Sequence, residues 1–181
     1  MKKFLTLWGI IASSFAFSQG TLIVNNYSPY ELRGLMMADN ANNSANGCFP
    51  RAGNNITVPA NAHMGNGLQL EYINFRDQFN TSLYPMATWS YALSPTNGNQ
   101  AAAWNDPVFD PAGILSTTSR WSTIKFQTFY PGTNNNVIGI LGNLSVDNNP
   151  CQPLMPWYID FPSGNYIEIF RIGDITYLSF Y

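Results

Sequence analysis

Aromatic and amide side chains stand next to each other at two places in this sequence. Trp104 is followed by Asn105 and Asp106, and Trp157 is followed by Tyr158. Aromatic rings pack on apolar surfaces, such as the faces of a sugar ring, while amides and carboxylates bond to hydroxyl groups. Aromatic residues make up 15% of the chain, so some can serve outside the core. We therefore take these five residues as candidates for a carbohydrate-binding surface.

The alternative for each ring is packing in the core. Tryptophan is mostly buried in folded proteins. Trp89 and Trp121 are the other two tryptophans beyond the N-terminal segment, and they are open to the same two interpretations. The sequence therefore leaves open which tryptophans are core and which are surface.

Nucleophilic catalysis has little support in these residues. His63 is the single histidine, and no Gly-x-Ser-x-Gly elbow occurs. A cysteine nucleophile needs a free thiol, but Cys48 and Cys151 are expected to pair. Zinc usually requires three or four ligands of the His, Cys or carboxylate type. We therefore name no catalytic residue and no metal ligand, and expect His63 in a loop or at the surface.

A small glycosidase-type hydrolase is an alternative function, because the chain contains carboxylates that could act as its catalytic acids. Such an enzyme needs two carboxyl groups about 5 Å or ~6.5–9.5 Å apart. Glu31, Glu71 and Glu168 fall on expected strands, from which they could face a cleft. Outward-facing or arginine-paired carboxylates explain the same residues.

Calcium is a second alternative, because it binds carboxylate and amide oxygens. Asp39 with Asn40, Asp106 with Asp110, and residues 147–149 could supply such ligands. None has the ligand spacing of an EF-hand loop, and Asn and Asp also stabilise turns. We therefore expect no cofactor and keep calcium as the weaker interpretation.

The elements that must position these residues are short strands. Runs of β-branched and aromatic residues are separated by Asn, Gly and Pro, which favours strands joined by turns. The expected strands cover 21–25, 30–35, 55–59, 67–73, 121–130, 137–144, 166–171 and 175–181. This pattern predicts an all-β fold, a single antiparallel β-sandwich of jelly-roll or Ig-like type, with a barrel as the alternative.

Three local expectations are specific enough to be checked. Ser28 and Pro29 predict a turn that returns the first strand as 30–35, and the last two strands should form a hairpin around Gly173. Residues 100–104 are the best helix candidate. They lie within residues 94–111, which are expected to form a long loop.

The N-terminus has the three parts of a secretory signal peptide. Lys2 and Lys3 precede an apolar run, and Ala16 and Ser18 place small residues before Gln19. We therefore expect a signal peptide at 1–18 and one β-rich domain at 19–181. The protein is expected outside the cytoplasm, in the periplasm, at the cell surface or in the medium, and there Cys48 and Cys151 should form a disulfide.

Charge narrows the possible partners. Removing Lys2 and Lys3 leaves six basic and ten acidic residues, a formal charge of −4. This negative charge argues against a nucleic-acid partner, which would favour a basic face, and against electrostatic attraction to anionic lipid. We expect a non-catalytic binding protein whose partner is a glycan or another cell-surface ligand. A membrane-active or outer-membrane β protein is the alternative, and the oligomeric state is left open.

Overall fold

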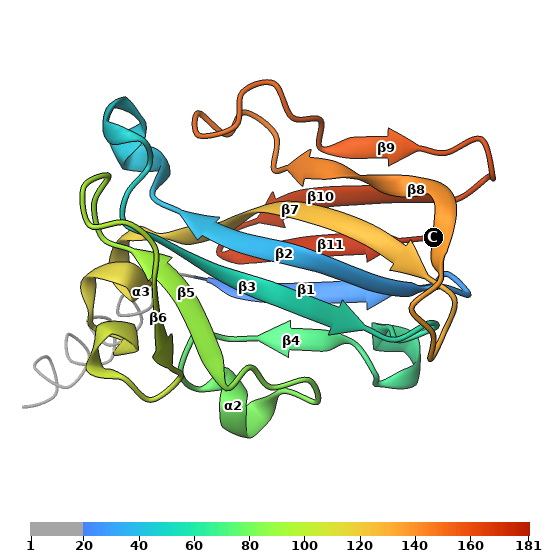
Figure 1. Ribbon diagram of the computed structural model, residues 1–181, viewed down its shortest axis with the longest axis horizontal. Helices are drawn as coiled ribbons and strands as arrows, with labels where there is room; N and C mark the ends of the chain where they lie inside the picture. Colours follow the sequence, from blue (N-terminus) through green and yellow to red (C-terminus); the bar gives the residue numbers. More distant parts are fainter. Residues whose placement is uncertain (1–19) are drawn as a thin grey trace, which may run out of the picture.

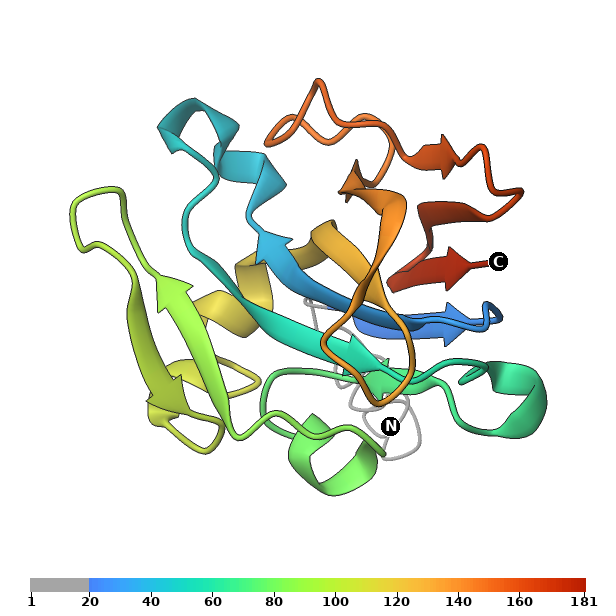
Figure 2. The ribbon, with the colours of Figure 1, turned by 45° about the vertical axis from the view of Figure 1, so that its right-hand side comes forward.

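The computed structural model describes residues 20–181. The expected signal peptide at 1–18 lies outside these described residues. Two β-sheets face each other across the core (Figures 1 and 2). The two sheets are separate and do not close into a barrel. The expectation of a β-sandwich is therefore confirmed, and the alternative of a barrel is wrong.

The first sheet has five strands in the order β4-β1-β11-β10-β9. Its strands are β1 (Thr21–Asn26), β4 (Leu70–Tyr72), β9 (Tyr158–Asp160), β10 (Tyr166–Ile172) and β11 (Ile175–Phe180). β10 and β11 form the expected antiparallel hairpin. β1 pairs with β11 in parallel, an exception to the otherwise antiparallel pairing of this sheet. The first and last strands of the described chain are therefore neighbours.

The second sheet has six strands in the order β6-β5-β3-β2-β7-β8, all antiparallel. Its strands are β2 (Glu31–Asp39), β3 (Arg51–Val58), β5 (Thr88–Ala92), β6 (Gln100–Ala103), β7 (Arg120–Phe129) and β8 (Asn136–Ser145). Buried and exposed side chains alternate along much of β3 and β7, as expected for a sheet with one face on the core.

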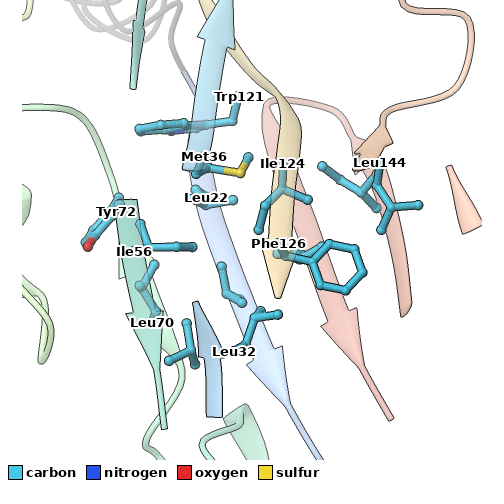
Figure 3. Packing of buried hydrophobic residues seen from close by; sticks show 14 of the residues in the cluster. Leu22, Leu32, Met36, Ile56, Leu70, Tyr72, Trp121, Ile124, Phe126 and Leu144 are labelled. Atoms are coloured by element: carbon cyan, nitrogen blue, oxygen red, sulfur yellow. The ribbon is translucent and has the colours of Figure 1, made fainter. Parts of the chain in front are cut away.

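The core lies between the two sheets (Figure 3). Leu22 of β1 packs in one cluster with Met36 of β2 and Ile124 of β7, all fully buried. Trp89 and Trp121 are also fully buried, and their ring centroids lie 5.8 Å apart. Each large side chain buried in this way contributes roughly 1.5–3 kcal/mol. Both tryptophans therefore belong to the core.

Two local expectations are wrong. Residues 100–103 form the edge strand β6, not a helix, because the alanines pair with β5. The segment after Pro29 does not return beside β1, because β2 crosses to the other sheet and pairs with β3 and β7. The buried Asn26 side chain directs this crossing by donating to the carbonyls of Tyr30 and Pro59.

The helices are short and lie in the connections. They are η1 (Ala41–Asn46), η2 (Met64–Asn66), α2 (Gln78–Thr81), η3 (Pro107–Phe109) and α3 (Ile114–Thr118). Within residues 20–181 no helix is both long and apolar enough to cross a membrane.

Cys48 and Cys151 form the expected disulfide. It joins the loop after η1 to the loop after β8 across 103 residues of sequence. Cys48 is buried and has a φ of +62°, so the backbone turns sharply where the bridge attaches. The two loops are therefore held against each other at one end of the sandwich.

We expect the disulfide to be a major contributor to stability. A loop of this length restricts the unfolded chain by up to about 4–5 kcal/mol in a chain-entropy treatment. The double substitution Cys48→Ser with Cys151→Ser should lower the free energy of unfolding by roughly 2–5 kcal/mol, measured by urea denaturation. Reductant should destabilise the wild type and leave the double variant unchanged. A double variant as stable as the oxidised wild type would contradict this expectation.

Candidate functional site

Six aromatic rings form a continuous row along the five-stranded sheet. We call this set the aromatic row. In order, its members are Trp157, Tyr158, Tyr166, Tyr181, Tyr27 and His63, with successive centroid distances of 5.8, 5.7, 4.4, 4.9 and 4.4 Å. Two of them, Trp157 and Tyr158, are sequence candidates. The predicted pair Trp157 and Tyr158 is therefore part of a larger aromatic surface.

Strand alternation turns these rings away from the core. On β10, Ile167 and Ile169 are buried, so Tyr166 points to the opposite face. On β11, Leu178 and Phe180 are buried, so the next residue, Tyr181, also faces outward. The ends of β1 and β11 lie on the same side of the molecule (Figure 1). Residues from distant parts of the sequence thereby meet at one end of the sheet.

The inner rings of the row cover one another. Tyr181 lies nearly parallel to Tyr166 at 18° and to Tyr27 at 9°. Tyr27 in turn stacks on His63 at 24°. Because a ring has only two faces, Tyr181 and Tyr27 have no face left for a ligand. The inner rings therefore present their edges to solvent.

Free ring faces lie at the other end of the row. Trp157 is 46% exposed and Tyr158 is 39% exposed. These two rings are tilted by 50° rather than stacked, so they do not cover each other fully. The surface suited to stacking on a ligand is therefore the Trp157–Tyr158 pair, supported by the inner rings.

His63 closes the row and is held by its own loop. Its Nδ1 accepts a hydrogen bond from the Gly65 backbone, which makes Nε2 the donor to Asn61 in the neutral ring. The side chain caps η2, and Asn61 has a positive φ of 54°. The expected loop position of His63 is confirmed, and its role there is structural.

A carboxylate lies beside the tyrosines. Glu168 of β10 pairs across strands with Tyr158 of β9. Desolvation raises the pKa of Tyr166 above its ordinary value, and negative charge on Tyr181, Glu168 and Tyr158 raises it further. Tyr166 therefore keeps its hydroxyl proton at neutral pH and can donate a hydrogen bond.

The other sequence candidates do not join the aromatic row. Trp104 stacks on Phe79 with centroids 4.5 Å apart and planes 4° apart, and it packs against the core. Asn105 is exposed. The Asp106 carboxylate accepts from the Val108 backbone at the start of η3. Their segment follows β6, the edge of the other sheet, so residues 104–106 do not form one site with Trp157 and Tyr158.

The candidate glycosidase carboxylates are also separated. Glu71 is on β4 and Glu168 is on β10, and β1 and β11 lie between these two strands. Because neighbouring strands are ~4.8 Å apart, β4 and β10 are separated by about 14 Å. Glu31 is on the other sheet and pairs with Arg33. The three carboxylates therefore do not form a neighbouring pair.

Two of the three calcium candidates do meet. Asp39, Asn40 and residues 147–149 line one cavity of about 480 Å³, which we call the end cavity. Asp110 instead pairs with Arg76. No group of three His, Cys, Asp or Glu side chains suited to a metal occurs in residues 20–181.

We expect Trp104 and Trp157 to differ in their effect on stability. Trp104→Ala removes a ring that packs on Phe79 and the core, and should lower the free energy of unfolding by roughly 2–3 kcal/mol. Trp157→Ala removes a largely exposed ring and should cost under about 1 kcal/mol. Urea denaturation of the two variants compares these effects. Equal losses would place Trp157 in the core as well.

We expect Asp39 to give the stability a pH dependence. Burial raises the pKa of its carboxyl above the unfolded value, although Ser122 and Arg51 partly oppose the shift. The folded state then binds the proton more tightly, so this contribution to stability is complete below about pH 4 and is lost as pH rises through the folded pKa. Asp39→Asn should remove that decline, seen in urea denaturation at pH 4 and pH 7. The exposed Asp160→Asn is the control, and an identical pH profile for both variants would contradict the expectation.

In comparisons with known proteins, no family model, curated protein or solved structure matched this chain.

Proposed function

We propose that this protein is an exported, non-catalytic carbohydrate-binding protein whose ligand stacks on Trp157 and Tyr158. The observation that carries the proposal is the pair of free ring faces at one end of the aromatic row. Rigid aromatic side chains supply contact area with little loss of conformational entropy on binding. Here the neighbouring rings already fix the position of Tyr158.

Polar groups beside the rings suit the hydroxyls of a sugar. Glu168 accepts hydrogen bonds, and the tyrosine hydroxyls can donate or accept them. Asp160 pairs across strands with Tyr166 and is exposed, which adds a second carboxylate at the edge. The combination of ring faces and acceptors supports a neutral, polyhydroxylated ligand more than an apolar one.

Export is the part of the proposal that rests on residues 1–18. Their charge, apolar run and small residues fit a signal peptide. The Cys48–Cys151 disulfide is compatible with an oxidising extracellular compartment.

Membrane contact is the second candidate. Leu154 is 96% exposed and lies three residues before Trp157, and such apolar and indole side chains suit a membrane interface. A protein that stays monomeric without detergent and releases no contents from liposomes would remove this candidate.

The test is a glycan array probed with residues 19–181, followed by calorimetry on the sugars that bind. Trp157→Ala and Tyr158→Ala should each weaken binding by roughly 10–30-fold, as central aromatic contacts do. Parallel arrays with calcium and with chelator would show whether a cation takes part.

Tyr130→Ala is the matched control, because Tyr130 is 50% exposed but lies outside the aromatic row. It should bind as the wild type does. A blank array from folded, disulfide-bonded protein would overturn the proposal. Binding that is unchanged in both row variants would show that the sugar binds elsewhere.

A further inference from the structure

The end cavity lies at the end of the strands opposite Tyr166 and Tyr181, whereas the Trp157 carbonyl accepts from the backbone of Ile169, two residues before the cavity residue Arg171. β2, β8 and β10 end there and β7 begins there (Figure 1). Its volume of about 480 Å³ is within the ~300–1,000 Å³ range of small-molecule pockets. Hydroxyl and amide side chains dominate its lining, including Thr118, Ser122 and Asn149. Such a lining favours a hydrophilic occupant.

Arg171 brings a positive charge to this cavity from an inward-facing position. β10 places Ile167 and Ile169 in the core, and Arg171 continues the same alternation. Its Nη2 donates to the Trp121 carbonyl and its Nε to the Thr176 hydroxyl at 3.3 Å. Across the described chain its Nη1 has no hydrogen-bond partner, and no carboxylate pairs with it. A half-buried guanidinium therefore keeps donors free.

Arg120 adds a second guanidinium to the same wall. It pairs with Asp174 at 2.7 Å, but both side chains are well exposed, at 41% and 65%, so the pair is weak. Desolvation lowers the pKa of Arg171, and repulsion from Arg120 lowers it further, while Asp174 opposes the change. Two like charges thus share one wall of the cavity, and the buried Asp39 stands opposite Arg120 in the pairing of β2 with β7.

The carboxylates of the cavity are placed differently. Asp39 accepts a hydrogen bond from Ser122 at 2.8 Å, and its electrostatic partner is Arg51 rather than either cavity arginine. Asp147 comes from the exposed loop after β8. These groups accept hydrogen bonds from hydroxyls, and they repel doubly charged phosphate more strongly than a singly charged carboxylate. The cavity therefore combines an anion-binding wall with hydroxyl-binding groups.

We propose that the end cavity binds a sugar that carries a carboxylate, with the carboxylate on Arg171 and Arg120 and the hydroxyls toward Asp39 and Asn149. Guanidinium groups match the planar geometry of a carboxylate. The site is separate from the aromatic row, and neither proposal depends on the other.

The test is calorimetry or ligand-observed NMR on the purified protein with glucuronate, galacturonate and N-acetylneuraminate as probes. Glucose and galactose are the neutral counterparts of glucuronate and galacturonate. Inorganic phosphate is the control for an anion that is not a sugar. At least one acidic sugar should bind roughly 10-fold or more tightly than its neutral counterpart, and phosphate should not compete at equal concentration. Equal binding of acidic and neutral sugars, or no binding of any acidic sugar, would overturn the proposal.

Arg171→Gln should weaken acidic-sugar binding by roughly 10-fold or more, whereas Arg171→Lys should retain part of it. Arg120→Gln is an independent second variant at a more exposed position, useful if Arg171→Gln fails to fold. Arg33→Gln, at the start of β2, is the matched control and should bind normally. Unchanged binding in folded Arg171→Gln and Arg120→Gln would overturn the assignment to this cavity.

Trp157→Ala separates the two proposals. It should leave binding of acidic sugars in the end cavity unchanged, even where it abolishes binding at the aromatic row. Loss of acidic-sugar binding in Trp157→Ala, with Arg171→Gln unaffected, would assign that ligand to the row and overturn the cavity proposal.

Discussion

Trp121 joins the two sheets, and much of the molecule depends on it. Its indole is fully buried and contacts Trp89, Tyr72 and Phe75. The backbone carbonyl of Trp121 accepts hydrogen bonds from the side chains of Arg171 and Thr176, which belong to the five-stranded sheet. One residue of β7 therefore fixes both the interior packing and the position of the guanidinium in the end cavity. A shift of this strand would alter the core and the cavity together.

The sandwich separates two kinds of surface chemistry. At one end, outward positions just after β1 and β11 carry stacked rings whose edges face solvent. At the other end, charged and amide groups surround the end cavity, next to loops held by the disulfide. Strand direction produces this separation, because β10 begins beside the rings and ends beside the cavity. The same hairpin thus supplies Tyr166 to one surface and Arg171 to the other.

Local patterns in the sequence predicted the fold class, the terminal hairpin, the disulfide and most long strands, because alternation and turn residues act over a few positions. They missed β6, because an alanine run carries no strand signal and becomes a strand only by pairing with β5. They also missed the crossing of β2, which depends on Asn26 bonding to Pro59, a residue 33 positions away.

Of the aromatic row, Trp157 and Tyr158 could be identified from the sequence, because they are adjacent aromatic residues. The other four rings could not, because their neighbours lie on different strands. Arg171 carries a visible signal, a charge at an inward position after Ile167 and Ile169. The other residues of its cavity, however, come from three separate stretches of the chain, 39–42, 117–122 and 146–150.

The parallel pairing of β1 with β11 has a mechanical consequence. Thr21 stands opposite Ile175 and Asn26 opposite Phe180, so the described chain starts at one end of this pair and finishes at the other. A force that draws the two termini apart along the strands acts on the pair in shear. All the hydrogen bonds between the two strands then share the load, whereas strands pulled from the same end would peel apart one bond at a time. Tension applied between the two ends of the described chain would therefore meet high resistance before the fold gives way.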